Sequence, residues 1–224
     1  MTGKEHLMYL LKLFHDNLPP NSEVMLQAQH SMIYVWKGSA TINDNAVAAD
    51  SAVYAADVVA VKAGAKGAVL WRWELVPKTD PLHLLNGKGV SSLLRVSRKV
   101  KMFELVPTSK WLLRLDTIIE HEGTTGLHSH PGSGIRCLLS GEMLIESEKG
   151  EGSINKNPGD VWYEEGAYPL VSSAPAGVKS SFLRGMILPP DFFVYPETAI
   201  WIERKTPARY KEWKPYVQKI VTLR

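Results

Sequence analysis

The sequence predicts an all-β protein made of two tandem β-sandwich or barrel domains. Short apolar or alternating segments recur along the chain, separated by clusters of Gly, Pro, Asn and Asp, which is typical of strands joined by turns. Several of these segments also occur twice, in the same order. With 224 residues, 45% of them hydrophobic and 22% charged, the chain has the composition of a globular protein and the length for two domains.

Strands are expected wherever a short apolar or alternating run lies between turn signals. In chain order these runs are residues 24–26, 33–36, 52–54, 69–75, 92–96, 112–119, 135–139, 143–146, 161–163, 170–172 and 182–188. Turns are expected at residues 19–22, 43–45, 87–89, 149–152 and 157–160. Near the C-terminus, residues 206–213 could form one or two helical turns, and residues 215–223 could form an edge strand or a packing tail. Regular short strands favour a sandwich or barrel over a parallel α/β sheet.

An internal repeat indicates that the two domains arose by duplication. The matching pairs, whose offsets grow slowly along the chain, are residues 9–13 with 111–115, 38–42 with 141–145, and 72–77 with 184–189. Arg72 and Arg184 occupy equivalent places in the last pair, and we expect both to be structural.

Composition also limits which classes of partner and which cellular compartment we expect for this protein. A net charge of +3 is too small and too dispersed for nucleic-acid binding, and the basic run at 95–101 alternates with apolar residues, as on a solvated strand face. No apolar run approaches the roughly 20 residues that span a bilayer, and Lys12 interrupts the apolar segment 7–14. The single cysteine, Cys137, cannot form an internal disulfide and is expected to be buried. We therefore expect a cytoplasmic protein without nucleic-acid or membrane partners.

A His-x-His pair carries the strongest chemical signal. Residues 126–131 read Gly-Leu-His-Ser-His-Pro. Because side chains in a strand alternate between its two faces, His128 and His130 point the same way. Two imidazoles side by side on a strand are a natural start for a divalent metal site.

These residues, the strand at 135–139 with its Ser-Gly turn, and Pro158-Gly159-Asp160 resemble the two motifs of the cupin superfamily. The resemblance covers about 109–190, with a degenerate copy at about 7–79. It implies a bicupin, two RmlC-like jelly-roll barrels in one chain. The domains it implies are a degenerate N-terminal barrel at 1–85, a connecting segment at 86–108, a C-terminal barrel with the candidate active site at 109–195, and a short extension at 196–224.

The resemblance implies a metal held by two His and a Glu from the first motif and a His from the second. Here Gly134 stands where the first motif carries glutamate, and Pro169 stands where the second carries histidine. In the first repeat, Met25 and Gln27 stand opposite the histidine pair. We therefore expect the N-terminal barrel to be structural and any metal to lie in the second barrel.

The missing ligands could come from residues that follow or precede the motifs. Glu165 is the third ligand we name, with Glu164 as its alternative and His121 or Glu122 as further candidates. Two His and one carboxylate would suit iron, and manganese, nickel or zinc are also consistent with such a donor set. The other interpretation is that the two histidines are hydrogen-bonded polar residues lining a pocket.

Two further residues are candidates for contact with a substrate. If the strand after Gly134 keeps the phase of the histidine pair, Arg136 points inward. A buried guanidinium needs a partner, either Glu164 or Glu165, or the carboxylate of a ligand. Alternation also places either Trp162 or Tyr163 on the pocket side, and the phenol of Tyr163 could transfer a proton.

The leading hypothesis is thus a metal-dependent enzyme acting on a small, carboxylated organic substrate, with oxygenase, isomerase and lyase chemistry left open. In it, His128, His130 and Glu165 bind the metal, and Arg136 and Tyr163 serve catalysis. The alternative is a metal-free protein that binds a small molecule without catalysis. The resemblance also suggests a homodimer formed through sheet edges.

Overall fold

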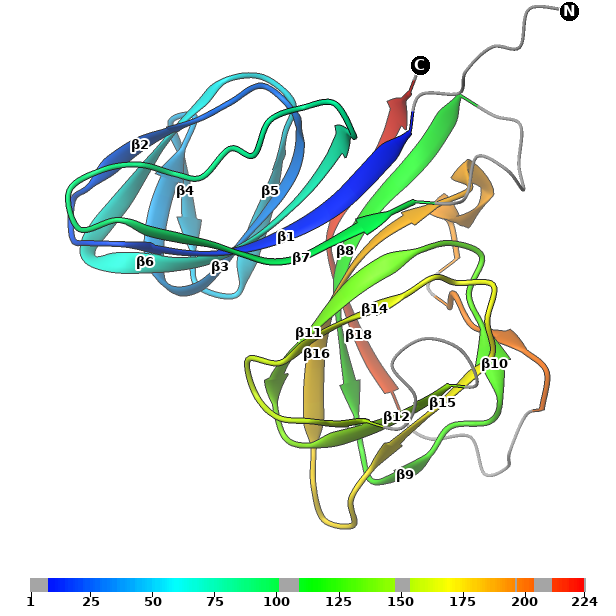
Figure 1. The fold of residues 1–224 in the computed structure, drawn as a ribbon. Helices are drawn as coiled ribbons and strands as arrows, with labels where there is room; N and C mark the ends of the chain where they lie inside the picture. The colour runs from blue at the N-terminus through cyan, green and yellow to red at the C-terminus, as the bar shows by residue number, and fades with distance from the viewer. Residues whose placement is uncertain (1–7, 101–108, 148–153, 196, 204–210, 224) are drawn as a thin grey trace, which may run out of the picture. The chain divides into compact units, whose positions relative to one another are not determined.

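The computed structural model describes residues 8–100, 109–147, 154–195, 197–203 and 211–223, and these are mostly β-strand (Figure 1). The chain divides into two compact units, Met1–Val100 and Lys101–Arg224. Within the described ranges there is no α-helix, and η2 (Pro190–Phe193) is a one-turn 3₁₀ helix. None of the described helices is long and apolar enough to cross a bilayer.

The first unit is built on one antiparallel sheet in the order β4-β3-β6-β1-β7, with β2 added to β6 and β5 added to β3. Its strands are β1 (Tyr9–Leu18), β2 (Glu23–Leu26), β3 (His30–Ile42), β4 (Asn45–Ala48), β5 (Ser51–Ala55), β6 (Val59–Pro77) and β7 (Ser91–Lys99). The predicted strands at 33–36 and 69–75 are therefore parts of the longer β3 and β6.

The second unit has two sheets, ordered β14-β11-β16-β8-β18 and β13-β12-β15-β10-β17, with β9 added to β15 (Figure 1). The strands are β8 (Lys110–Glu120), β9 (Gly123–Thr124), β10 (His128–Ser129), β11 (Gly134–Ser140), β12 (Met143–Ser147), β13 (Ile154–Lys156), β14 (Val161–Glu164), β15 (Leu170–Ala174), β16 (Ser180–Leu188), β17 (Ile200–Trp201) and β18 (Lys211–Thr222).

The two units share one topology, as the internal repeat predicts. The central strands β3, β6 and β1 of the first unit correspond to β11, β16 and β8 of the second, and β5 and β7 correspond to β14 and β18. The register agrees as well, because Arg72 faces Ile33 in the first unit and Arg184 faces Arg136 in the second. Ile33 and Arg136 are therefore equivalent positions.

Two predicted boundaries differ from the structure. The segment 86–108, expected as a connector, contains β7, which pairs with β1. The segment 196–224, expected as an extension, contains β17 and β18, and β18 pairs with β8 along its length. Each flanking strand covers a sheet edge, and the sequence shows a strand there but not its partner. Residues 211–213 belong to β18 rather than to a helical turn, and 206–210 lie outside the described residues.

The two units differ in the size of their apolar core clusters. In the first unit, a large cluster of buried apolar side chains that includes Val24, Leu26, Ile33, Val35 and Leu70 forms the core. In the second unit the main cluster is smaller and comprises Ile118, Leu138, Met143, Ile145, Trp162 and Phe182, with Trp213 packed against it. A further apolar cluster of Leu112, Met186 and Leu188 lies in the same unit, and buried charged side chains surround the candidate site.

Candidate functional site

A cavity of about 210 Å³ lies inside the second unit, between its two sheets. Its apolar lining includes Ile118, Met143, Ile145, Leu170, Phe182 and Trp213. The polar part includes His128, His130, Arg136, Glu164, Arg184 and Thr198. An apolar enclosure with a few converging polar groups is the usual form of a small-molecule site.

The predicted histidine pair lies in this cavity. The ring centroids of His128 and His130 are 5.1 Å apart, and both side chains are buried. Nδ1 of His128 lies 2.9 Å from the backbone carbonyl of Gly126, and Nδ1 of His130 lies 3.0 Å from that of Thr198. A carbonyl only accepts hydrogen bonds, so we assign the Nδ1 proton in both rings, which fixes their orientation.

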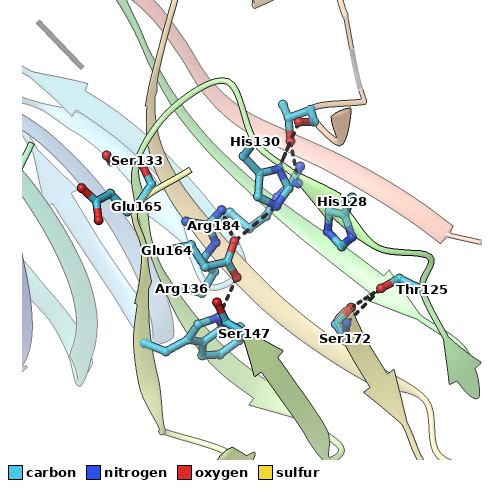
Figure 2. Close-up of polar contacts among 12 residues, drawn as sticks. Thr125, His128, His130, Ser133, Arg136, Ser147, Glu164, Glu165, Ser172 and Arg184 are labelled. Carbon is cyan, nitrogen blue, oxygen red and sulfur yellow. Dashed lines mark hydrogen bonds and ion pairs between the residues drawn. The ribbon is translucent and has the colours of Figure 1, made fainter. Parts of the chain in front are cut away.

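Arg136 and Glu164 meet beside His130 (Figure 2). They project from the neighbouring strands β11 and β14, on which Gly134 is paired with Glu164. Nη2 of Arg136 is 2.6 Å from Oε2 of Glu164, and Nε2 of His130 is 3.2 Å from the same oxygen. Nε1 of Trp162 donates a 2.8 Å hydrogen bond to the other carboxylate oxygen. Arg136 thus points inward, as strand alternation predicts.

Burial and charge act in opposite directions on this cluster. Burial raises the pKa of Glu164, but Arg136, His130 and Trp162 together lower it far below its usual value, so the carboxylate is ionised. Burial lowers the pKa of His130, Glu164 raises it, and Arg136 and Arg184 add to the lowering, so the pKa of His130 is lowered overall. The ion pair between Arg136 and Glu164 therefore dominates the electrostatics beside the histidines.

A second buried charge cluster adjoins the first. Asp116 accepts hydrogen bonds from Nε and Nη2 of Arg184 at 2.8 and 2.9 Å, from Nε of Arg114 at 2.8 Å and from Nε1 of Trp213 at 2.8 Å. Nη1 of Arg184 donates to the hydroxyl of Thr198 at 3.0 Å. The structural role expected for Arg184 agrees with these contacts, but Arg184 also lines the cavity.

These two clusters carry an excess positive charge. They contain the guanidinium groups of Arg114, Arg136 and Arg184 and the carboxylates of Asp116 and Glu164. Two further carboxylates, those of Glu120 and Glu197, also line the cavity, and Glu120 is four residues along β8 from Asp116, or about 13 Å by strand rise. Nη1 of Arg136, in a side chain with 0% exposure, has no hydrogen-bond partner among the described residues.

Two predicted site residues lie elsewhere. The side chain of Glu165 points away from the histidine pair in Figure 2 and does not line the cavity, whereas its neighbour Glu164 does. Tyr163 follows Trp162 on β14 and so faces the opposite side of the strand, and it does not line the cavity either. Their neighbours Glu164 and Trp162 line the cavity instead, because only every second side chain of a strand points to the interior.

The further candidates His121 and Glu122 are also outside the cavity. His121 lies 3.6 Å from the carboxylate of Glu212 at the surface, and Glu122 accepts a hydrogen bond from the backbone of Gly177. Neither is among the lining residues. Both come after β8 ends at Glu120, so their direction could not be deduced from strand phase.

Sequence reasoning missed the contribution of residues 197–201 to the site. Thr198 contacts both His130 and Arg184, and the Trp201 ring packs on His128 with centroids 5.2 Å apart. β17 brings these residues in by pairing with β10. No signal in the sequence indicated this pairing, because β17 has only two residues.

The donor set does not fit a divalent metal. Among the described residues there is no group of three His, Cys, Asp or Glu side chains arranged to hold a metal ion. Glu164 is engaged by Arg136 and Trp162, which leaves the two histidines alone, and stable transition-metal sites normally have three or four protein ligands. In addition, the residue paired with His128 on the neighbouring strand is Leu170, whose apolar side chain cannot bind a metal.

No protein-family model and no curated protein sequence matches the chain. Solved structures do match. A structure of oxalate decarboxylase has a TM-score of 0.54 at 15% identity, and a variant of the Bacillus subtilis enzyme has a TM-score of 0.53 at 13% identity. Each match covers 82% of this chain and 73% of that one. Salicylate 1,2-dioxygenase from Pseudaminobacter salicylatoxidans follows with a TM-score of 0.48 at 9% identity, over 83% of this chain and 73% of that one.

At these identities the likeness is one of fold. The tandem units, their shared strand order and these neighbours show that the chain has the cupin fold, in the two-barrel arrangement of a bicupin.

Proposed function

We propose that the second barrel binds a small organic carboxylate in its cavity. The observation that carries this proposal is the fully buried guanidinium of Arg136, whose Nη1 has no hydrogen-bond partner among the described residues. A buried donor left without an acceptor is costly, and the planar guanidinium matches the geometry of a carboxylate. A second guanidinium in the cavity lining, that of Arg184, also supports an anionic ligand.

The apolar wall supports an organic acid over an inorganic anion. Ile118, Met143 and Phe182 lie in the same cavity as Arg136, so a ligand's carbon skeleton would contact them while its carboxylate reaches the guanidinium. Oxalate decarboxylase, which shares the fold, is named for a small carboxylate. The histidine pair would then serve as hydrogen-bonding groups beside the ligand.

A second candidate is a metal-dependent cupin enzyme, and one observation favours it. Both histidines donate from Nδ1 to a backbone carbonyl, which is how metal-binding histidines are commonly oriented. Bound at Nε2, an iron, manganese, nickel or zinc ion would supply Lewis-acid or redox chemistry. The engagement of Glu164 by Arg136 speaks against this candidate.

Calorimetric titration of oxalate, malonate, benzoate and salicylate, each beside its neutral amide, tests the first candidate. We expect at least one acid to bind and its amide not to bind. Arg136→Gln should weaken binding by about 10- to 100-fold, because a charge-assisted hydrogen bond is lost. The double variant with Glu164→Gln avoids an unpaired buried carboxylate and should behave alike. Arg98→Gln, at an exposed arginine, is the matched control.

Two results would contradict the proposal: no acid binds, or the Arg136 variants bind as tightly as the parent. Elemental analysis of tag-free protein decides the second candidate. Near-stoichiometric metal in the parent that is absent from the double variant His128→Ala with His130→Ala would establish a metal site and support the metal-dependent enzyme. Absence of metal after incubation with excess divalent ions would eliminate it.

A further inference from the structure

The space beside Gly134 is filled by the guanidinium of Arg136. A Cβ atom at position 134 would lie 2.5 Å from Nη1 of Arg136, 2.7 Å from Cγ of Met186 and 2.9 Å from the backbone oxygen of Gly185. Such distances are shorter than real contacts, so a side chain at 134 would collide with Arg136, with Met186 and with the backbone of Gly185. Glycine at 134 therefore leaves the space that the Arg136 guanidinium fills, and a glutamate at 134 would not fit beside it.

The same guanidinium forms an ion pair with the carboxylate that a metal ion would need. Oxygen Oε2 of Glu164 is 2.6 Å from Nη2 of Arg136 and 3.2 Å from Nε2 of His130. Two ligand atoms of one ion with bonds of about 2.1 Å are about 3.0 to 3.4 Å apart. Nε2 of His130 and Oε2 of Glu164 thus have the spacing of two ligands of one ion. The positive charge beside them is the guanidinium of Arg136 and not a metal ion.

The orientation of the histidines completes this picture. With Nδ1 of each ring held by a backbone carbonyl, Nε2 is the nitrogen left to accept a proton or a metal. The rings of His128 and His130 pack against each other on one side of the cavity. With the guanidinium in place, no three of the described His, Cys, Asp and Glu side chains are arranged to hold a metal ion.

We propose that Arg136 is a built-in cation that replaces a metal ion in the second barrel, and that neutralising it exposes a latent divalent-metal site formed by His128, His130 and Glu164. The positive charge of Arg136 satisfies Glu164 and repels a second cation from the cavity. This inference does not depend on carboxylate binding, because it concerns the charge at position 136 and uses metal alone as the probe.

Cobalt(II) titration in a buffer without carboxylates tests the proposal, followed by visible absorption and by calorimetry. The parent protein should show no site-bound cobalt spectrum. Arg136→Gln should bind one equivalent at least about 100-fold more tightly than the parent. Arg136→Lys keeps the cation and should remain like the parent. Circular dichroism establishes that each variant is folded, and Arg98→Gln again serves as the control.

The double variant Arg136→Gln with His130→Ala identifies the ligands, and it should lose the gained site. Three outcomes would overturn the proposal: tight cobalt binding by the parent, no gain in folded Arg136→Gln, or a gain that survives His130→Ala. None of these coincides with failure of the proposed function, which is read from titrations of organic acids into the parent protein.

Discussion

Asp116 shows at the scale of one residue how the second barrel tolerates a charged interior. The side chain is fully buried, yet Arg114, Arg184 and Trp213 all donate hydrogen bonds to it. Burial raises the pKa of Asp116, and the two arginines more than reverse this effect, so the pKa is lowered overall. An ionised carboxylate here is stable only because its partners are present.

This residue predicts how stability depends on pH. Since the folded state lowers the pKa of Asp116, the contribution is fully present above the unfolded value of about 3.9 and is lost as pH falls below it. Urea unfolding should therefore show decreasing stability below about pH 5. Asp116→Asn should cost about 3–5 kcal/mol at pH 7 and have a smaller effect at pH 3.

Asp57→Asn, at an exposed aspartate, is the control for this series and should leave the pH profile unchanged. An Asp116→Asn deficit that stays constant from pH 7 to pH 3 would contradict the interpretation, because it would show a role unrelated to ionisation.

At the scale of elements, β18 is an integral part of the second barrel. It pairs with β8 from Lys211 opposite Glu120 to Thr222 opposite Lys110. It also supplies Trp213, which contacts Asp116 and lines the cavity. A strand that follows the motifs by dozens of residues thus completes the sheet that carries the site.

Truncation after Glu203 should therefore abolish the cooperative unfolding transition of the second unit. The loss exposes the backbone edge of β8 and removes the Trp213 partner of Asp116. Differential scanning calorimetry checks this, with the transition of the first unit as the internal reference. Retention of both transitions in the truncated chain would show that β18 is dispensable.

At the scale of the whole molecule, one topology serves two purposes. The first unit has Ile33 in a buried apolar cluster at the position where the second has Arg136 beside its cavity. Ala55 likewise pairs with Ser31 in the first unit as Glu164 pairs with Gly134 in the second. The first barrel accordingly has apolar side chains at the two positions where the second has Arg136 and Glu164 beside its cavity.

The variant Ile33→Ala should affect the stability of the first barrel without affecting ligand binding in the second. Removing a fully buried isoleucine side chain should lower the free energy of unfolding of the first unit by about 2–5 kcal/mol. The dissociation constant for a carboxylate that binds the parent should stay unchanged in calorimetric titration. A large change in that constant would contradict the assignment of ligand binding to the second barrel alone.

Much of this architecture could be read from local patterns. Alternation predicted inward-facing Arg136 and a shared face for His128 and His130, because strand geometry depends on neighbours in the chain. The repeat predicted the duplicated topology. The choice between Glu164 and Glu165 could not be made, because a shift of one residue in strand phase exchanges the two faces.

By itself, the sequence determined the all-β class, the duplication and the shared direction of His128 and His130, since these follow from periodicity and repetition within the chain. Tertiary structure alone decided that Arg136 takes the carboxylate of Glu164, that Gly134 leaves room for it, and that Thr198 and Trp201 contact the histidines. These contacts join strands distant in sequence, and their distances arise only when the sheets pair and close around the cavity.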